Sequence, residues 1–207
     1  MIIKLEHTSI PTITCWNEIL NDCFKLSTFL SRVDSFAEKI NDQDIANKFK
    51  GDVFEILCEI MIRMSPLDDR IGISDYHVAP VDEPGVDGFG TNFIGEALTV
   101  QIKWRQWDYD LDAARDHLNN FRAISFAKYG VDPTKTGNML IITSGKGVHF
   151  RTLYKQFDKK VRFLSRNASF GCLRGMGSET IPGIFSLKTL LDDNKMFWQT
   201  FLESVKR

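Results

Sequence analysis

The sequence has few of the features that would place a protein in a membrane or outside the cell. Its beginning, MIIKLEHTSIPTI, lacks the basic start, the long apolar run and the small-residue cleavage site of a signal peptide. No stretch approaches the roughly 18 apolar residues that a membrane span needs. We therefore expect a soluble, intracellular and cytoplasmic protein with no membrane partner.

Cysteine is equally sparse, and its spacing excludes two common kinds of site. There is no Cys-x-x-Cys pair and no histidine at zinc-finger spacing, so neither a zinc site nor a redox motif is indicated. We expect the four cysteines to be reduced thiols: Cys15, Cys23, Cys58 and Cys172.

The chain also lacks a strong net charge. Its 26 basic residues offset 27 acidic ones, for a formal net charge of −1, which argues against charge-driven disorder and against a histone-like role. A nucleic-acid partner would have to meet a local patch. The nucleotide-binding signature GxxxxGK[ST] is absent as well, so we expect no nucleotide cofactor.

What the sequence does contain is apolar residues at helical and strand spacing. Helices are predicted for residues 15–41, interrupted at Asn21-Asp22, and for residues 44–64, ended by Ser65-Pro66. Strands are predicted within 71–81, at 86–90 and 97–104 as a hairpin, at 139–143 and at 161–164. Further helices are predicted at 111–129, at 149–157 and, capped by Ser186, at 186–205.

This order of elements predicts an α/β fold, a mixed central sheet flanked by helices. The 207 residues can bury one good core. We expect residues 1–43 to be a helical N-terminal addition and residues 44–207 to be the sheet domain with its C-terminal helix.

The predicted hairpin carries polar side chains suited to a divalent metal. Asp87 lies on its first arm, and Gln101 and Lys103 lie two residues apart on the second. Alternation puts Gln101 and Lys103 on one face, while Ile102 points into the core and leaves its backbone carbonyl available. Phosphodiester hydrolysis at neutral pH uses hard oxygen ligands for Mg²⁺, a positioned water and a positive group near the phosphorus.

The ordered set of motifs resembles the PD-(D/E)xK nuclease superfamily. Asp87-Gly88 is followed fourteen positions later by Gln101-Ile102-Lys103, and residues 51–55, GDVFE, precede both on a helix. The QxK variant, with GVDG before it and LIITS at 140–144 after the next helix, is more similar to the Mrr-type restriction endonucleases. The resemblance covers residues 51–164 and implies a restriction-endonuclease-like sheet.

The resemblance also implies a role for each site residue. Asp87 would be the metal-binding carboxylate, Gln101 would give an amide oxygen where Asp or Glu is usual, and the Ile102 carbonyl would be a further ligand. Lys103 would orient the attacking water and stabilise the transition state. Glu55 would complete the metal or water site, with Glu59, one turn later on the same face, as its alternative.

The implied activity is a Mg²⁺-dependent endodeoxyribonuclease, with Mn²⁺ able to substitute. It would serve restriction or defence, or phage or mobile-element DNA processing, in a bacterial or phage-encoded protein, and cutting both strands would need a homodimer or a larger complex. Two departures are that Val86 stands where the family has proline and that Gln101 carries no charge. A catalytically inactive DNA-binding or assembly subunit therefore stays open, as do a turn role for Asp87 and a solvated strand face for Gln101 and Lys103.

A second part of the chain suits contact with a DNA backbone. Residues 146–174 hold eight basic side chains against one acidic one. Trp104, Arg105 and Trp107 follow Lys103 and could stack near the site, although core packing is the commoner fate of tryptophan. His149 could lie near a phosphate at backbone amides, or be an ordinary surface or capping residue. The expected DNA-binding residues are Lys146, His149, Arg151, Lys155, Lys159, Lys160, Arg162, Trp104 and Arg105.

Overall fold

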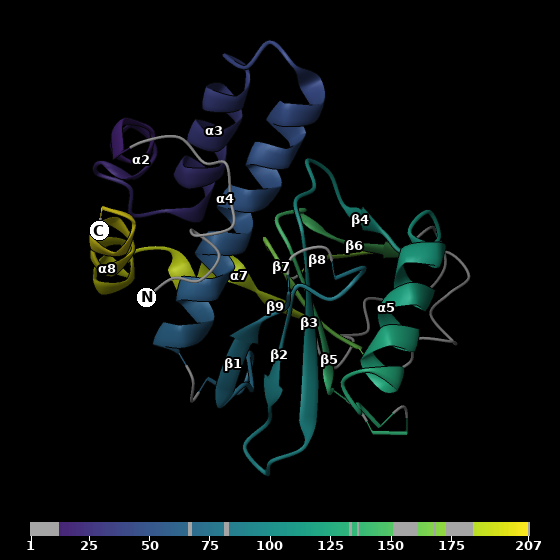
Figure 1. The fold of residues 1–207 in the computed structure, drawn as a ribbon. Coiled ribbons are helices and arrows are strands. Elements are labelled where there is room, and N and C mark those ends of the chain that lie inside the picture. The colour runs from purple at the N-terminus through teal and green to yellow at the C-terminus, as the bar shows by residue number, and fades with distance from the viewer. Residues whose placement is uncertain are drawn as a thin grey trace. The chain divides into compact units, whose positions relative to one another are not determined.

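The computed structural model describes residues 13–65, 68–80, 83–132, 134–135, 137–150, 161–167, 169–172 and 184–206. The chain forms two compact units (Figure 1). The helical unit comprises Met1–Met64 with Leu187–Arg207, and the sheet unit comprises Ser65–Ser186. Residues 44–64, expected to belong to the sheet domain, group with the helices instead.

The helical unit is built around aromatic side chains. Phe29 lies 5.7 Å from Trp198 and 5.8 Å from Phe201, and Trp16 lies 5.7 Å from Phe201, between ring centroids. The helices predicted within 15–41, with their interruption, and at 44–64 are confirmed. No described helix is both long and apolar enough to cross a membrane. The helices of this unit are α2 (Ile13–Leu20), α3 (Leu26–Ala37), α4 (Gln43–Met64), α7 (Leu187–Leu191) and α8 (Lys195–Val205).

The single helix predicted over 186–205 is wrong in one respect. It is interrupted after α7, because Asp193 has a left-handed φ of 59° and the Asn194 side chain caps α8 by accepting from the Phe197 N–H at 3.1 Å. Ser186 directly precedes α7, and its hydroxyl donates to the Arg166 carbonyl at 3.0 Å, so its role as a helix cap stays a prediction.

The sheet unit holds a mixed six-stranded sheet, which confirms the α/β class. Its order is β1-β2-β3-β5-β7-β9, with β1, β2 and β3 antiparallel and β3, β5, β7 and β9 parallel. The predicted hairpin is the β2–β3 pair. The strands are β1 (Asp75–Val78), β2 (Gly88–Thr91), β3 (Ala97–Lys103), β5 (Met139–Thr143), β7 (Val161–Ser165) and β9 (Ile184–Ser186).

A second, three-stranded parallel sheet was not predicted. It consists of β4 (Tyr109–Asp110), β6 (Gly147–Phe150) and β8 (Ser169–Cys172), in the order β4-β6-β8. The helix predicted at 149–157 is wrong at its start, because His149 pairs with Asp110 and Gly171 as a strand residue. Residues 151–157 lie outside the described part of the chain.

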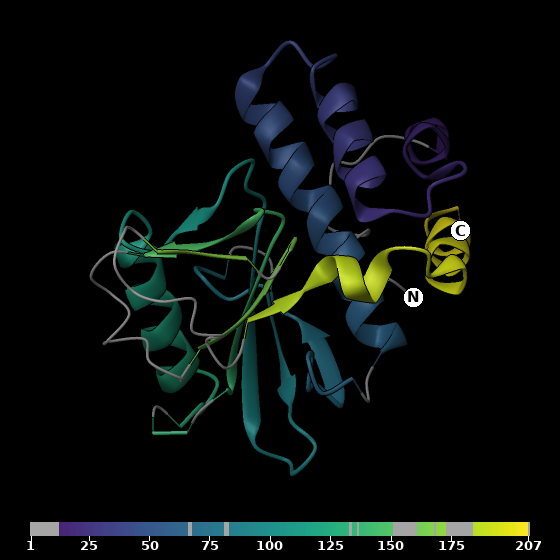
Figure 2. The ribbon, with the colours of Figure 1, turned by 180° about the vertical axis from the view of Figure 1, so that it is seen from behind.

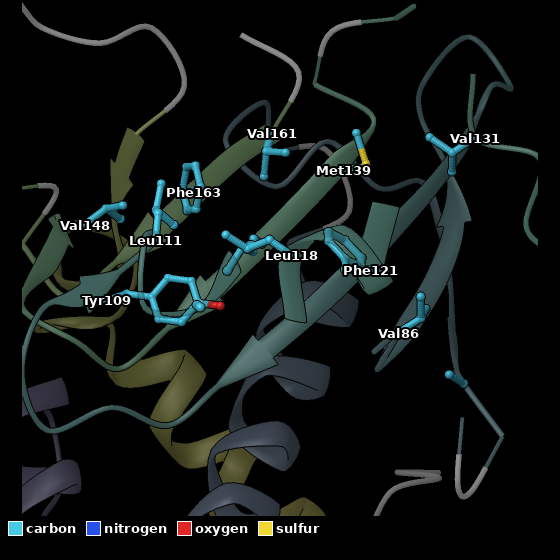
Figure 3. Packing of buried hydrophobic residues seen from close by; sticks show 13 residues of the cluster. Val86, Tyr109, Leu111, Leu118, Phe121, Val131, Met139, Val148, Val161 and Phe163 are labelled. Carbon is cyan, nitrogen blue, oxygen red and sulfur yellow. The ribbon is translucent and has the colours of Figure 1, made fainter. Parts of the chain in front are cut away.

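The apolar core of the sheet unit lies between one sheet face and α5 (Arg115–Ala127), within the helix predicted at 111–129. Figure 1 and Figure 2 both show α5 along this face, and Figure 3 shows the packed side chains. Ile141 of β5 belongs to this core and pairs in register with Gln101. Thr99 contacts Ser125 of α5, with 2.7 Å between their hydroxyl oxygens. The side chains of Thr99 and Gln101 therefore face α5, whereas Ile102 faces the opposite side.

Part of the GVDGFG motif has a purely steric explanation. A Cβ added at Gly90 would lie 1.8 Å from the Asp75 carbonyl oxygen, and one at Gly88 would lie 2.4 Å from the Tyr76 ring. Both glycines therefore let β1 approach β2 closely. Asp87, directly before Gly88, has no such steric role.

Candidate functional site

Asp87 and Lys103 meet where the β2–β3 hairpin opens. Asp87 directly precedes β2; its N–H donates to the Val100 carbonyl at 2.9 Å, and its Oδ2 accepts from the Ile102 N–H at 2.6 Å. Lys103 Nζ lies 3.8 Å from the same Oδ2, and the two side chains are 25% (Lys103) and 17% (Asp87) exposed. The carboxylate is thus fixed by the neighbouring strand and still reachable from solvent.

Gln101 is the most unusual group near this point, because it is polar and only 1% exposed. Its Nε2 donates to the Gly85 carbonyl at 2.9 Å. A carbonyl can only accept, so this bond fixes which end of the amide carries the oxygen. Among the described residues Oε1 has no hydrogen-bond partner, and an unsatisfied buried acceptor costs about 1–3 kcal/mol.

Ile102 contributes through its backbone. Its side chain is 4% exposed, and in a strand the N–H and C=O of one residue point to the same edge. Because the N–H donates to Asp87, the carbonyl faces the Asp87 edge too. The available donors are a carboxylate, an amide oxygen and a peptide carbonyl, a set of hard oxygen atoms that fits Mg²⁺ or Mn²⁺.

This donor set contains a single acidic side chain in the sheet unit. Within the described parts of the chain, no three His, Cys, Asp or Glu side chains gather as a metal-binding group. A cation held at Asp87 would therefore depend on neutral oxygens from Gln101 and Ile102, as expected from the glutamine in the QxK motif.

The two candidate glutamates lie on α4, in the helical unit. Glu59 is 1% exposed and accepts from Arg63 Nε at 2.9 Å, so its charge is already balanced within that helix. Glu55 is half-buried. Its participation with Asp87 stays a prediction, because the two residues belong to different units.

Two residues of the site region were not predicted from the sequence. Tyr109 is 1% exposed, and its hydroxyl has no hydrogen-bond partner among the described residues. Burial raises the pKa of Tyr109, Arg105 opposes that shift, and the Asp87 charge adds to it, which places the ring near the site. Ser144 binds the loop after β3, accepting from the Arg105 N–H at 2.8 Å and donating to the Arg105 carbonyl at 3.0 Å. Nothing in the sequence indicated a role at the site for Tyr109 or for Ser144, which ends the predicted strand segment LIITS.

The expected DNA-binding residues fall into different surroundings. Arg105 and Lys146 are exposed at the ends of β3 and β5, and Trp104 is half-buried. His149 lies within β6, 3.9 Å from Asp110 Oδ2 to its Nδ1, rather than at the start of a helix. Four of the predicted contacts lie outside the described residues: Arg151, Lys155, Lys159 and Lys160.

For Arg162, predicted to bind DNA, the structure indicates a role in the fold instead. Its nitrogens donate to four backbone carbonyls: Gly137 at 2.7 Å, Asp69 at 3.1 Å, Arg70 at 3.2 Å and Ile71 at 2.8 Å. Burial lowers its pKa. Four of the five guanidinium N–H groups are thus engaged by the fold, which argues against Arg162 as a main phosphate contact.

Replacing Arg162 with lysine is therefore expected to destabilise the sheet unit without changing DNA affinity. A lysine cannot span four carbonyls, and each buried carbonyl left unpaired costs about 1–3 kcal/mol. Thermal unfolding measures the first effect and the salt dependence of DNA binding the second. The matched control is Arg115→Lys on α5, whose side chain is 54% exposed. Loss of DNA affinity at unchanged stability would restore Arg162 to the DNA interface.

Comparisons with known proteins add no family to this geometry. No family model, no curated protein and no solved structure matches the chain. The resemblance to PD-(D/E)xK nucleases thus rests on the ordered motifs of this sequence alone.

Proposed function

We propose that this chain is a Mg²⁺-dependent endodeoxyribonuclease of the PD-(D/E)xK type, with Asp87, Gln101 and Lys103 in its active site. The observation that carries the proposal is the amide oxygen of Gln101, which is buried, oriented by the Gly85 carbonyl and without a hydrogen-bond partner among the described residues. If this oxygen is a metal ligand, its lack of a hydrogen-bond partner is explained. It lies on β3, the strand whose Ile102 N–H donates to Asp87.

Asp87, the Gln101 amide and the Ile102 carbonyl would hold the cation, and Glu55 is the further carboxylate that the resemblance implies. Bound Mg²⁺ supplies Lewis-acid polarisation of the phosphate and a lowered pKa of water. The Ile102 N–H, 2.6 Å from Asp87 Oδ2, holds the carboxylate in one orientation. Lys103, 3.8 Å from the same oxygen, would orient the attacking water and offset the charge developing on the phosphoryl oxygens.

The direct test is cleavage of supercoiled, linear, single-stranded and branched DNA, with Mg²⁺ and with a chelator. Metal-dependent nicking of any of these substrates supports the proposal. Purified protein that cuts none of them in Mg²⁺ or Mn²⁺ contradicts it.

Lys103→Ala is expected to slow cleavage by about 10²–10³-fold, the usual loss when a transition-state stabiliser is deleted. DNA binding in chelator should change little. The matched control is Lys135→Ala. Lys135 is 54% exposed and pairs with Glu96, which precedes the first residue of β3, whereas Lys103 is its last residue. Wild-type turnover in the Lys103 variant would make that lysine a surface charge.

A second function is favoured by one observation, the neutral side chain of Gln101 where the family usually has a carboxylate. With a single acidic ligand among the described residues of the sheet unit, the chain could bind DNA as an inactive or assembly subunit. Tight DNA binding in chelator, with no cleavage in any metal, would select this function.

A further inference from the structure

An exposed tryptophan stands close to the candidate site. Trp107, in the loop after β3, is 68% exposed, whereas Trp16 and Trp198 are 3% and 2% exposed. A single apolar side chain at the surface is common and identifies nothing by itself. Two further observations indicate a binding role for Trp107: its loop is held in place, and basic residues lie nearby.

The backbone that carries Trp107 is held in place. Ser144 N donates to the Lys103 carbonyl at 3.2 Å, and the Ser144 hydroxyl bonds both the N–H and the carbonyl of Arg105. Beyond Ser144, a Cβ added at Gly145 would lie 2.5 Å from the Trp107 carbonyl oxygen, so only a glycine lets the loop lie this close. The indole is thus presented by a fixed loop beside Lys103.

One cation contacts the ring, and two more basic residues lie on neighbouring segments. Lys146 Nζ lies 5.5 Å from the Trp107 ring centroid, and exposed Arg105 is two residues away in the loop. Arg166, after β7, binds the same loop: its backbone N–H donates to the Gly145 carbonyl at 2.8 Å, and its Nε donates to the Ser144 carbonyl at 3.0 Å. The exposed acid Asp108 is the immediate neighbour. An exposed aromatic face among basic side chains is the combination that binds single-stranded nucleic acid, by base stacking and phosphate contact.

We propose that Trp107 stacks on an unpaired base of the DNA strand whose phosphate lies at Asp87 and Lys103. Trp107 follows Lys103 by four residues, so their Cα atoms are at most about 14 Å apart, within a few nucleotides of the cleaved bond. Bases in a continuous duplex are already stacked and must be unstacked before they can meet an indole. The substrate class is therefore DNA with unpaired bases beside the cleaved bond, such as single strands, forks or flaps.

This inference rests on the proposed nuclease function for the position of the phosphate, but its test does not require cleavage. Fluorescence anisotropy in chelator compares a labelled single strand, a fork and a blunt duplex of one sequence. Trp107→Ala should weaken binding to the single strand and the fork by about 10- to 100-fold, the loss expected for one base–aromatic stack. Trp107→Phe should keep most of the affinity, and binding to the blunt duplex should be unchanged.

The matched control is Phe126→Ala, which removes another exposed aromatic ring, 59% exposed on α5. It should bind all three DNA forms as the wild type does, and thermal unfolding should show that every variant is folded. Equal loss of affinity for all three forms, no loss for any, or a wild type that binds none of them would overturn the stacking proposal. Stacking with no Mg²⁺-dependent cleavage would instead reject the nuclease and keep the binding surface, so the two failures are distinguishable.

Discussion

Replacing Asp87 with asparagine is expected to abolish DNA cleavage while the hairpin stays folded. Asparagine keeps an oxygen that can accept the Ile102 N–H, which now donates to Asp87 Oδ2 at 2.6 Å. It removes the single acidic side chain that the described part of the sheet unit contributes to the proposed ligand set. Alanine would also lose the hydrogen bond, at a cost of about 1–3 kcal/mol, and so would confuse folding with catalysis. The nicking rate of supercoiled DNA in Mg²⁺ and in Mn²⁺ measures the effect.

The control for this substitution is Asp75→Asn on β1. Its side chain is 66% exposed and lies 3.0 Å from His77, between Oδ2 and Nε2. This variant should cut DNA at the wild-type rate. Asp87→Asn should bind DNA in chelator at least as well as the wild type, because it removes a charge that repels phosphate. Retained cutting by the Asp87 variant would show that the carboxylate is only a capping group of the hairpin.

The elements that could be predicted from the sequence are those with a local signal. The helical periodicity of 44–64 predicts α4, and alternation over 97–104 predicts β3, because the spacing of apolar residues within one segment determines both. The three-stranded sheet has no such signal. Tyr109 pairs with Val148, and Val148 with Phe170, so each strand depends on partners far along the chain.

The same distinction explains the site. Period two predicts that Gln101 shares a face with Lys103, but burial of the amide depends on α5 and on the Gly85 carbonyl, sixteen residues away. Arg162 looked like any other cation of a basic segment. Its partners at 69–71 and at Gly137 lie up to 93 residues away, and no spacing rule connects a surface-like arginine with such carbonyls.

Gln101→Glu separates a metal ligand from a buried structural amide. In chelator the new carboxylate loses the donation from Nε2 to the Gly85 carbonyl at 2.9 Å and sets two oxygen acceptors against each other. The side chain is 1% exposed, so the charge has little water to compensate it. The expected loss of stability is about 3 kcal/mol or more, as for other uncompensated buried charges. This effect appears as a lower midpoint of thermal unfolding.

Adding Mn²⁺ should reverse that loss if Gln101 faces the cation, because a full charge binds a divalent ion more strongly than an amide dipole does. Binding to the folded state alone stabilises it by about 2.7 kcal/mol at a metal concentration 100 times Kd. The Gln101→Glu variant should therefore show a larger Mn²⁺-induced rise in unfolding midpoint than the wild type, and a tighter Kd by calorimetry. Gln106→Glu is the control, since Gln106 is exposed in the loop after β3 and should change neither quantity. A Gln101→Glu variant that is destabilised but gains nothing from Mn²⁺ would mean that this amide only ties β3 to the turn at Gly85, and the metal site would have to be sought elsewhere.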